Sequence, residues 1–322
     1  MKPPLVSVVM PTYNAGKYVE EAISSILGQT FSDFEFIIVD DGSTDRTPEI
    51  LRTYTDPRIQ LLFNEKNEGN YPARNRGCRL ARGKYIAVMD GDDVAMPERL
   101  EKQVKFMEEN PDALACGTAY RIMDKKQIIV EPMEWEDIRY ILMKTFCMLH
   151  PTLLIRKEAL EQSGSYGKES RYAEDCDLIL RLARIGKVVN IPDVLLNRRW
   201  HDEQISTKYN RPQNDFAGKV QLRYQHECGI YYPPKNPDFF LQNLVAYLRA
   251  TASYVSQGGL YNGRLGIILF FYLYARYKQE TEYHKIADQM LEKVLNELKD
   301  DMPVDLNYGV CGAHPMQERI VR

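Results

Sequence analysis

Apolar and polar positions follow two different periods between Leu5 and Val130, and the order of these periods predicts the fold. Short apolar runs rich in β-branched residues predict strands at residues 5–10, 34–39, 59–63 and 85–89. Helical patterns predict helices at residues 17–27, from about residue 45, at 72–82 and at 97–110. Residues 113–123 and 127–131 are typical of a strand pair. Strands that alternate with helices predict an α/β fold, with a mostly parallel, Rossmann-like sheet covered by helices on both faces.

Acidic residues directly follow two of the predicted strands. The residues at the ends of the first, second and fourth strands are Pro11, Thr12 and Tyr13, then Asp40 and Asp41, then Asp90, Asp92 and Asp93. Because ligands bind outside the carboxyl ends of parallel strands, we expect these side chains to converge at one edge of the sheet. Oxygen-only ligands suit a hard cation, Mg²⁺ or Mn²⁺, which commonly binds substrate phosphates as well. The chain has no Walker-type or GxGxxG motif, so such a metal would bind a diphosphate without a P-loop.

Some of these acids also have an ordinary structural interpretation. Aspartates cap helices and initiate turns, and for Asp93 alone we favour that role over metal binding. Asp41 is a candidate for holding the turn at residues 40–45, in which Gly42 permits positive φ. For Asp92 the three converging strand ends favour the metal site.

The composition of the chain is informative mainly because it excludes several classes of function. The 322-residue chain has a formal net charge of −3, which argues against binding nucleic acid or anionic membranes through bulk charge. Six cysteines without CxxC spacing predict a reducing, cytoplasmic setting and no structural zinc. We see no signal peptide, and the most apolar segment, residues 265–275, is shorter than the ~20 residues that cross a bilayer. We expect a cytoplasmic protein, with peripheral association at the inner face of the membrane left open.

Several motifs in order resemble the inverting GT-A fold glycosyltransferases of family 2. They are `VSVVMPTYNAG`, `FEFIIVDDGSTDRT`, `NEGNYPARNRGCRLARGKYIAVMDGDDVAMPERL`, `MLHPTLLIRKEAL`, `YAEDCDLILRLARIG` and `LLNRRWHDEQIS`. The resemblance covers roughly residues 4–205 and implies a GT-A catalytic domain at residues 1–206. It also implies a metal-dependent enzyme that moves a sugar from a nucleotide diphosphate to an acceptor hydroxyl, with inversion.

The resemblance implies roles for residues that bind the donor diphosphate. Asp92 would be the direct ligand of Mn²⁺ or Mg²⁺, and Asp90 would contact the ribose or metal-bound water within the same site. His201 would lie near the diphosphate or metal, although a lone histidine is more often structural. His150 is expected to be structural.

Further roles concern the nucleoside. Asp40 would accept a hydrogen bond from the base, usually uracil, so that the donor would be a UDP-sugar. Pro11 and Tyr13 would line the base pocket, with the tyrosine stacking on the base. Arg74 would contact the nucleotide, the alternative being a solvated arginine on the helix surface.

The catalytic base is expected in the second half of the domain. Glu174, Asp175 and Asp177 begin an amphipathic helix, where acids also complement the helix dipole. By resemblance Asp175 removes the proton of the acceptor hydroxyl. We expect Asp177 to cap the helix. A single displacement needs such a base and no covalent nucleophile.

The C-terminal part of the chain has a different pattern. Residues 207–218 are polar and are interpreted as a linker, and residues 219–322 as a helical region. Residues 260–295 faintly resemble one helical hairpin of lanthionine-synthetase-like proteins, without zinc ligands, so cyclase activity is not implied. Acceptor recognition, homodimerisation through these helices, and support of the catalytic domain stay open.

The favoured interpretation is a glycosyltransferase of surface polysaccharide or glycoconjugate biosynthesis. Its partners would be a nucleotide-sugar donor and a saccharide, lipid-linked saccharide or peptide acceptor. The alternatives are a nucleotidyltransferase of similar topology and a non-catalytic sugar-nucleotide-binding or scaffold protein. Intact Asp40, Asp92 and Asp175 argue against the non-catalytic alternative.

Overall fold

The computed structural model describes residues 2–123, 125, 127–142, 145–167, 173–201, 204, 210–227, 264–279 and 281–296. The chain divides into two compact units, Met1–Tyr232 and Pro233–Arg322. Each unit is described by itself.

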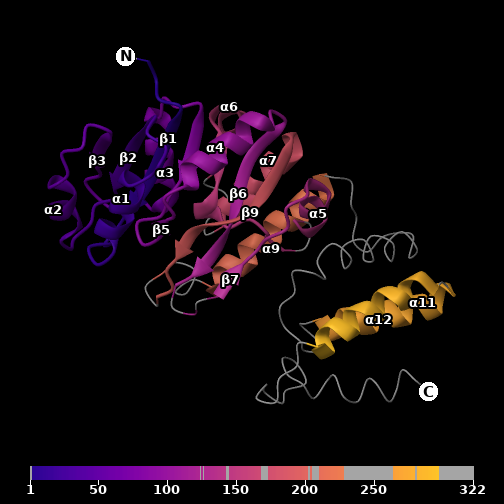
Figure 1. The fold of residues 1–322 in the computed structure, drawn as a ribbon. Coiled ribbons are helices and arrows are strands. Elements are labelled where there is room, and N and C mark those ends of the chain that lie inside the picture. Colours follow the sequence, from indigo (N-terminus) through magenta and orange to yellow (C-terminus); the bar gives the residue numbers. More distant parts are fainter. Residues whose placement is uncertain are drawn as a thin grey trace. The chain divides into compact units, whose positions relative to one another are not determined.

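The first unit is built on a single mixed sheet (Figure 1). In the described residues its strands are β1 (Val6–Thr12), β2 (Phe34–Asp40), β3 (Ile59–Phe63), β4 (Tyr85–Val88), β5 (Val94–Ala95), β6 (Ala113–Ile122), β7 (Gln127–Ile129), β8 (Leu154–Arg156) and β9 (Lys187–Arg198). Their order is β3-β2-β1-β4-β8-β6-β9-β5, with β7 beside β6. The four strands β1 to β4 are parallel, and β6 and β7 are antiparallel neighbours, as predicted. The parallel half therefore presents the carboxyl ends of β1, β2 and β4 at one edge.

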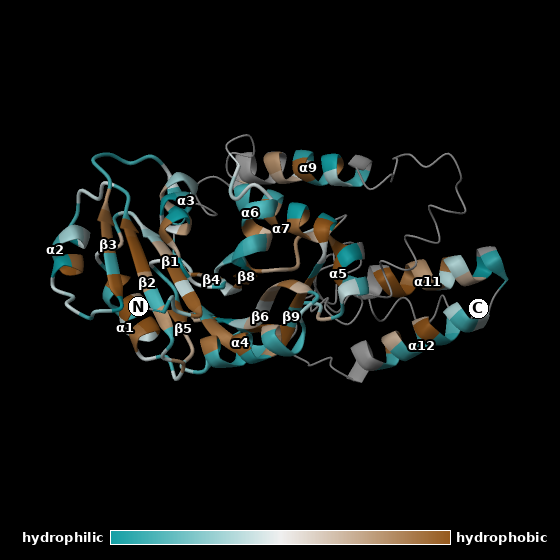
Figure 2. Cartoon of the chain, turned by 90° about the horizontal axis from the view of Figure 1, so that it is seen from above, coloured by the Kyte–Doolittle hydropathy of each residue, from teal (hydrophilic) through white to brown (hydrophobic). Residues whose placement is uncertain are grey.

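Helices cover both faces of this sheet (Figure 2). The helices of the first unit are α1 (Val19–Leu27), α2 (Thr47–Arg52), α3 (Asn70–Leu80), α4 (Arg99–Glu109), α5 (Trp135–Ile141), α6 (Lys157–Gln162), α7 (Glu174–Ile185) and α9 (Asn210–Glu227), with a 3₁₀ turn, η1, at His150–Thr152. In Figure 2, α1 and α4 lie on one face, and α3, α6 and α7 lie on the other. The α/β prediction is confirmed.

Strand parity decides what each face of the sheet contacts. Even-numbered residues of β1 and β2, such as Val8 and Phe36, pack in the core cluster with residues of α1 and α4. Odd-numbered residues face α3, where a Cβ on Gly77 would lie 2.6 Å from Cγ1 of Val9. Gly77 therefore lets α3 pack directly on the sheet, which brings the start of that helix to the edge where β1 and β4 end.

The segment at residues 207–218 differs from the prediction of a linker. Helix α9 begins at Asn210 and so occupies most of that segment, and the first compact unit extends to Tyr232. Pro212 is compatible with a helix here because it lies in the first turn, whose N–H groups have no intrahelical partner. A polar composition alone did not distinguish a linker from a helix.

The second unit contains α11 (Arg264–Lys278) and α12 (Thr281–Asn296), which pack against each other. The rings of Phe271 and Tyr283 stack between them, and the Tyr272 hydroxyl donates to Asp288 at 2.5 Å. This part of the predicted helical region is confirmed, whereas residues 228–263 and 297–322 lie outside the described residues. Among the described helices, none combines the length and apolarity that spanning a bilayer requires.

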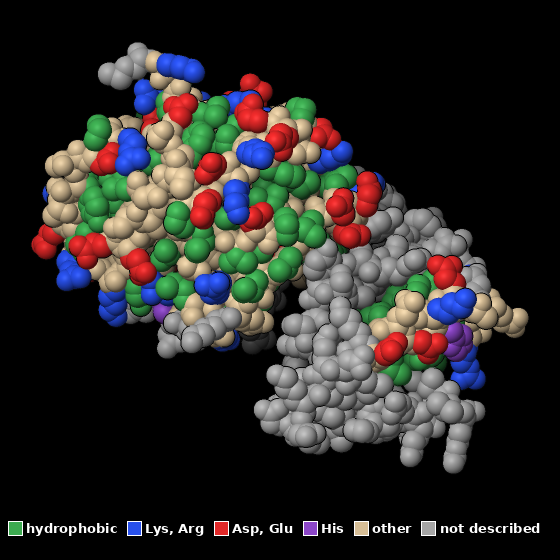
Figure 3. Space-filling view, in the orientation of Figure 1, with side chains coloured by type: hydrophobic (Ala, Val, Ile, Leu, Met, Phe, Trp, Pro, Cys, Tyr) green, Lys and Arg blue, Asp and Glu red, His purple; other side chains and the backbone are tan. Residues whose placement is uncertain are grey.

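Charges of both signs are interspersed on the face of the first unit that Figure 3 shows. The informative charges are instead those inside the molecule.

Candidate functional site

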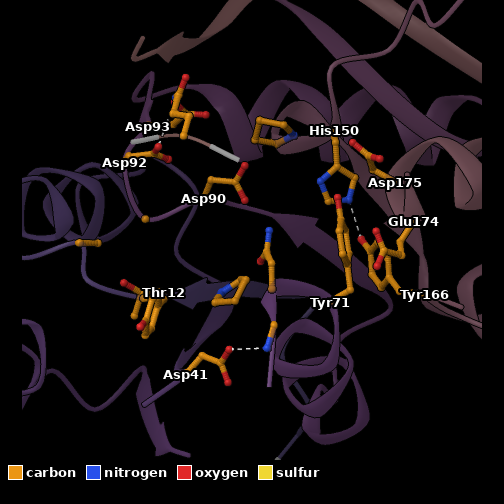
Figure 4. A pocket seen from close by; sticks show the side chains of 18 of the residues that line it. Thr12, Asp41, Tyr71, Asp90, Asp92, Asp93, His150, Tyr166, Glu174 and Asp175 are labelled. Carbon is orange, nitrogen blue, oxygen red and sulfur yellow. Dashed lines mark hydrogen bonds between the residues drawn. The ribbon is translucent and has the colours of Figure 1, made fainter. Parts of the chain in front are cut away.

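The carboxyl ends of β1, β2 and β4 open onto a cavity of about 1530 Å³ (Figure 4). Pro11 and Tyr13 line it from the end of β1, Asp41 from the end of β2, and Asp90 and Asp92 from the end of β4. The topology therefore brings together residues from three strand ends, as the sequence predicted. Tyr13 is 47% exposed, so its ring is accessible to a ligand.

The acidic loop after β4 gathers three carboxyl groups in one place. Asp90, Asp92 and Asp93 each offer a carboxylate oxygen within 4.8 Å of the others. Burial raises the pKa of Asp93 well above its usual range, and the charges of Asp92 and Asp90 raise it further. Oxygen atoms at this spacing fit a hard divalent cation, which would relieve the repulsion between the carboxylates.

Asp93 is held by the backbone of the segment after β9. Its Oδ1 accepts a hydrogen bond from the backbone N–H of Arg199 at 2.9 Å. It does not cap α4, whose N-cap position is Glu98 and carries no side-chain cap. The helix-cap role that we considered for Asp93 is therefore wrong, because the carboxyl group turns inward to a segment far away in sequence. The preference for a structural role of Asp93 over metal binding stays a prediction.

Arg74 lies behind the acidic loop rather than in the cavity wall. Its guanidinium pairs with Asp90 at 2.5 Å and donates to the backbone oxygens of Val9 and Met89 at 3.3 and 3.1 Å. The side chain is buried, which excludes the alternative of a solvated arginine. Burial acts to raise the pKa of Asp90, but the charge and hydrogen bond of Arg74 help to reverse this and lower it. Arg74 thus holds the Asp90 carboxylate in place, and a contact of Arg74 with the nucleotide stays a prediction.

His201 and Asp92 are brought together by the chain segment that follows β9. Nε2 of His201 lies 2.9 Å from Oδ2 of Asp92, and the Gln204 amide donates to the same oxygen at 3.3 Å. The His201 ring also packs on Tyr18, with ring centroids 5.0 Å apart. His201 therefore stands where a metal held by Asp92 would be within reach of it.

Asp40, at the end of β2, and Asp41, directly after it, differ in the direction of their side chains from what we expected. Asp40 accepts hydrogen bonds from the Ser43 hydroxyl at 2.5 Å and from its backbone N–H at 3.3 Å, so Asp40 holds the turn. Gly42 has φ of +72° in that turn, as predicted. Asp41 lines the cavity and accepts from Asn64 at 2.6 Å and from the backbone N–H of Gly69 at 2.8 Å. Asp40 is an even-numbered position of β2 and points to the α1 face, whereas Asp41 has the opposite parity.

Asp175 lies across the cavity from the acidic loop (Figure 4). It is in the first turn of α7, where its Oδ1 accepts from the backbone N–H of Cys176 at 2.8 Å. Burial raises the pKa of this carboxyl group, with a smaller contribution from the charge of Asp90. A carboxyl group with a raised pKa at a cavity wall is suited to take up a proton.

A cluster of aromatic side chains lies at the same wall of the cavity. Nε2 of His150 lies 2.8 Å from the Tyr166 hydroxyl, and Tyr71 packs against both rings. Burial lowers the pKa of His150 to about 3, with help from the Arg74 charge, so this imidazole is neutral at physiological pH. His150 therefore has the structural contacts that we expected, although it also lines the cavity.

Asp177 does not cap α7. The N-cap position is Ala173, without a side-chain cap, and Asp177 instead pairs with Arg181 at 3.0 Å and with Arg223 of α9. The cap expectation is wrong because Asp177, although in the first turn, pairs with arginines of α7 and α9 and caps no backbone N–H group of the described residues. Its buried carboxylate joins the two helices.

Several side chains of the site were not predicted from the sequence. They are Tyr18, Tyr71, Tyr166 and Gln204. Tyr71 belongs to the `NEGNYPARN` stretch quoted above. Tyr71, Asn75 and Arg79 follow one another at intervals of four residues, and this helical spacing would have placed them on one face of α3. Gln204 carries no such signal, because its place depends on the path of the chain after β9.

Two family models match the chain. The model described as glycosyl transferase family 2 matches residues 7–164, and the model described as lanthionine synthetase C-like protein matches residues 254–314. An uncharacterised glycosyltransferase of Methanocaldococcus jannaschii is 38% identical over 262 residues, covering 77% of this chain and 89% of that protein. The putative teichuronic acid biosynthesis glycosyltransferase TuaG of Bacillus subtilis is 44% identical over 122 residues, 37% of this chain and 48% of that protein.

Solved structures share the fold. S. aureus TarS 1–349 in complex with UDP-GlcNAc has a TM-score of 0.56 at 16% identity, covering 93% of this chain and 94% of that chain. The mannosyltransferase of Pyrobaculum calidifontis in complex with GDP-Man and Mn²⁺ has a TM-score of 0.54 at 20% identity, covering 94% and 89%. The first unit has the GT-A fold of nucleotide-sugar glycosyltransferases. The chain belongs to glycosyl transferase family 2.

Proposed function

We propose that the protein is an inverting, metal-dependent glycosyltransferase that moves a sugar from a UDP-sugar to an acceptor hydroxyl. The observation that carries this proposal is the opposition of the Asp90–Asp92 acids and Asp175 across one cavity. A donor diphosphate at the acids would leave its anomeric carbon facing the wall that holds Asp175.

The donor diphosphate is assigned to the acidic loop. Asp92 and Asp90 would hold a Mg²⁺ or Mn²⁺ ion, with His201 beside Asp92 as a further ligand. When bound, the cation neutralises the negative charge that gathers on the departing diphosphate. Arg74 fixes the Asp90 carboxylate so that it needs no reorganisation when the ligand arrives. The Pyrobaculum mannosyltransferase complex with Mn²⁺ supports this assignment.

The nucleoside is assigned to the end of the cavity formed by β1 and β2. Tyr13 would stack on the base, and Pro11 would limit the depth of the pocket. Asp41 would accept the N3–H of uracil in place of Asp40, because Asp41 faces the cavity and Asp40 is engaged in its turn. The complex of TarS with UDP-GlcNAc supports uridine as the nucleoside.

Transfer itself is assigned to Asp175. Its carboxylate takes the proton of the acceptor hydroxyl while the hydroxyl oxygen attacks the anomeric carbon. The bond from that carbon to the diphosphate oxygen breaks, UDP leaves with the electron pair, and the configuration inverts. A positioned general base contributes typically about 10²–10⁴-fold to the rate. The raised pKa of Asp175 favours this role, because burial makes the carboxylate a stronger base.

The product is assigned to surface polysaccharide or glycoconjugate biosynthesis. The support is the similarity to TuaG, a putative glycosyltransferase of teichuronic acid biosynthesis. The acceptor would be a saccharide, free or lipid-linked, and the cytoplasm is the expected compartment. Neither the nucleotidyltransferase nor the scaffold alternative gains an observation from the site.

A donor screen tests this function. The full-length protein would be incubated with UDP-, GDP- and ADP-sugars, with and without Mn²⁺, and release of nucleoside diphosphate would be followed. We expect slow release from one or more UDP-sugars that requires Mn²⁺ and disappears in Asp92→Asn. Metal-independent release, or release from ADP-sugars in preference to UDP-sugars, would contradict the proposal.

A further inference from the structure

Part of the cavity wall is formed by residues that the donor assignment does not use. They are Tyr120 of β6, Glu131 after β7, and Phe146 and Met148 before η1. Three of the four are apolar or aromatic, and Glu131 is the carboxyl group among them.

The fold holds these segments side by side. The side-chain amide of Asn190, on β9, donates to the backbone oxygens of Pro132 and Cys147 at 2.7 and 2.9 Å. Asn190 is buried, so these two bonds fix the residue after Glu131 to the residue between Phe146 and Met148. Tyr120 lies on the neighbouring strand, opposite Ile129 of β7. The wall is therefore a built surface with a defined side-chain arrangement.

The carboxyl group of Glu131 lies at this surface without a partner among the described residues. Within the described part of the chain, no hydrogen bond or ion pair is formed by its carboxyl group. Burial raises the pKa of Glu131 to about 7, and its charge adds to the burial that raises the pKa of Tyr120 to about 12. A desolvated carboxyl group without a partner is unfavourable for stability, which is typical of a group retained for a ligand.

The chemistry of the wall fits one kind of ligand. A sugar ring has an apolar C–H face, which packs on aromatic side chains, and hydroxyl groups at its edge, which donate to a carboxylate. Phosphate or carboxylate groups of an acceptor would instead be repelled by the Glu131 charge.

Arg198 is a cation that reaches this wall as well as the donor side, since its charge and a hydrogen bond act to lower the pKa of Tyr120 against the larger effect of burial. Its charge acts to lower the pKa of Asp90 and of Asp93, and its guanidinium lies over the Trp200 ring at 5.3 Å. Its positive charge is therefore shared between the Tyr120 hydroxyl and the carboxyl groups of the acidic loop.

We propose that the Tyr120–Glu131–Phe146–Met148 wall is the acceptor subsite, and that Glu131 selects a neutral saccharide over a phosphorylated one. This inference rests on the proposed transferase function and names the class of its second substrate. Glu131 acts as a specificity-determining residue, and Asp175 keeps the proton transfer.

The test uses two variants of the full-length protein, Glu131→Gln and Glu134→Gln. The second removes the same charge from an exposed position three residues away and serves as the matched control. The probes are p-nitrophenyl β-glycosides of glucose, galactose and N-acetylglucosamine, and the 6-phosphates of the same glycosides. Stimulation of UDP release is measured at pH 8, where Glu131 is ionised, and donor hydrolysis without acceptor is measured in parallel.

We expect a neutral glycoside to stimulate UDP release from the unmodified protein and its 6-phosphate to do so far less. Glu131→Gln should raise the KM of the neutral glycoside about tenfold and lower that of the phosphate, whereas Glu134→Gln should change neither these KM values nor donor hydrolysis. Unchanged KM values in Glu131→Gln would overturn the inference. So would a preference for phosphorylated glycosides, or failure of all neutral glycosides while donor hydrolysis proceeds. If the unmodified protein hydrolysed no donor at all, that result would instead overturn the proposed function.

Discussion

Nε2 of His201 lies 2.9 Å from Oδ2 of Asp92, although the two residues come from distant parts of the chain. The contact depends on β9, which pairs with the short strand β5 directly after the acidic loop. The segment that packs against the acidic loop is therefore the one that follows β9, a strand of the other half of the sheet. This places an imidazole nitrogen beside Asp92, one of the two partly exposed acids of the cluster.

The first prediction concerns the metal. Because Asp92 should share a cation with the donor diphosphate, Asp92→Asn should lower UDP affinity at least tenfold in Mn²⁺, which is about 1.4 kcal/mol. EDTA should have a similar effect on the unmodified protein and almost none on the variant. Isothermal titration calorimetry measures this, with Asp193→Asn as a control for an exposed acid. Equal UDP binding with and without metal would refute the assignment.

The second prediction separates Asp41 from Asp40. Asp41→Asn should reduce the preference for UDP over CDP, because cytosine has no N3–H for a carboxylate to accept. Asp40→Asn should keep that preference and lower the melting temperature, because Asp40 holds the turn through Ser43. Competition binding of UDP and CDP, together with thermal unfolding, distinguishes the two. If Asp40→Asn alone removed the preference, the original assignment of Asp40 would be correct.

The third prediction concerns Asp175. Asp175→Asn should reduce transfer at least about a hundredfold with UDP affinity unchanged. Since burial raises the pKa of the native carboxyl group and disfavours its ionised form, the variant should be at least as stable near pH 7. The acid limb of the rate profile should lie above the usual pKa of an aspartate, with transfer increasing as pH rises through it. Kinetics from pH 4 to 8 would show this. Asp177→Asn is the control, and it should lose stability more than rate.

The fourth prediction concerns Arg74. Arg74→Met should destabilise the protein by about 3 kcal/mol, the low end of the range for breaking a buried ion pair, because Asp90 keeps partial contact with water. It should also weaken Mn²⁺-dependent UDP binding, because Asp90 loses its fixed position. Urea unfolding measures the first effect. Lys105→Met, at an exposed position of α4, should change stability by less than about 0.5 kcal/mol. Equal stability of the two variants would show that the buried pair contributes nothing.

The fifth prediction follows from the pKa of Glu131, which burial raises to about 7. Below about pH 4.5 the group is protonated in the folded and unfolded states, so it imposes no penalty. As pH rises to 7 and beyond, the unfolded state loses the proton more readily, and the folded state is destabilised. The groups that face Glu131 are Tyr120 and Cys147, and both stay protonated over this range. Glu131→Gln should therefore raise the melting temperature at pH 8 more than at pH 5, whereas Glu134→Gln should not.

The parallel half of the sheet was predictable because each of its strands is a short, mostly apolar run followed by a helix. The strands β8 and β9 were not predicted, since they pair with residues far away and their sequences lack a clean alternation. The same distinction applies to the site. Convergence of strand ends follows from topology, but the direction of Asp40 and Asp41 depends on strand parity, which a strand buried on both faces conceals.

Buried charge was also beyond the sequence. Arg74 stands among three other arginines on or near α3, and composition predicts exposure for all of them. Its burial depends on Gly77, which draws the helix onto β1, and on two backbone oxygens at the sheet edge. Only the folded chain shows which arginine has those partners.

The pairing of Asp177 with Arg223 has a practical consequence for anyone who expresses the catalytic unit alone. A boundary chosen from family motifs would fall near residue 206 and would remove α9 with its arginine. The buried Asp177 carboxylate on α7 would then keep only Arg181 as a counterion. Such a shortened protein could aggregate or lose activity for a reason unrelated to its substrates. Ending it after Tyr232, where the first compact unit ends, keeps this pair intact.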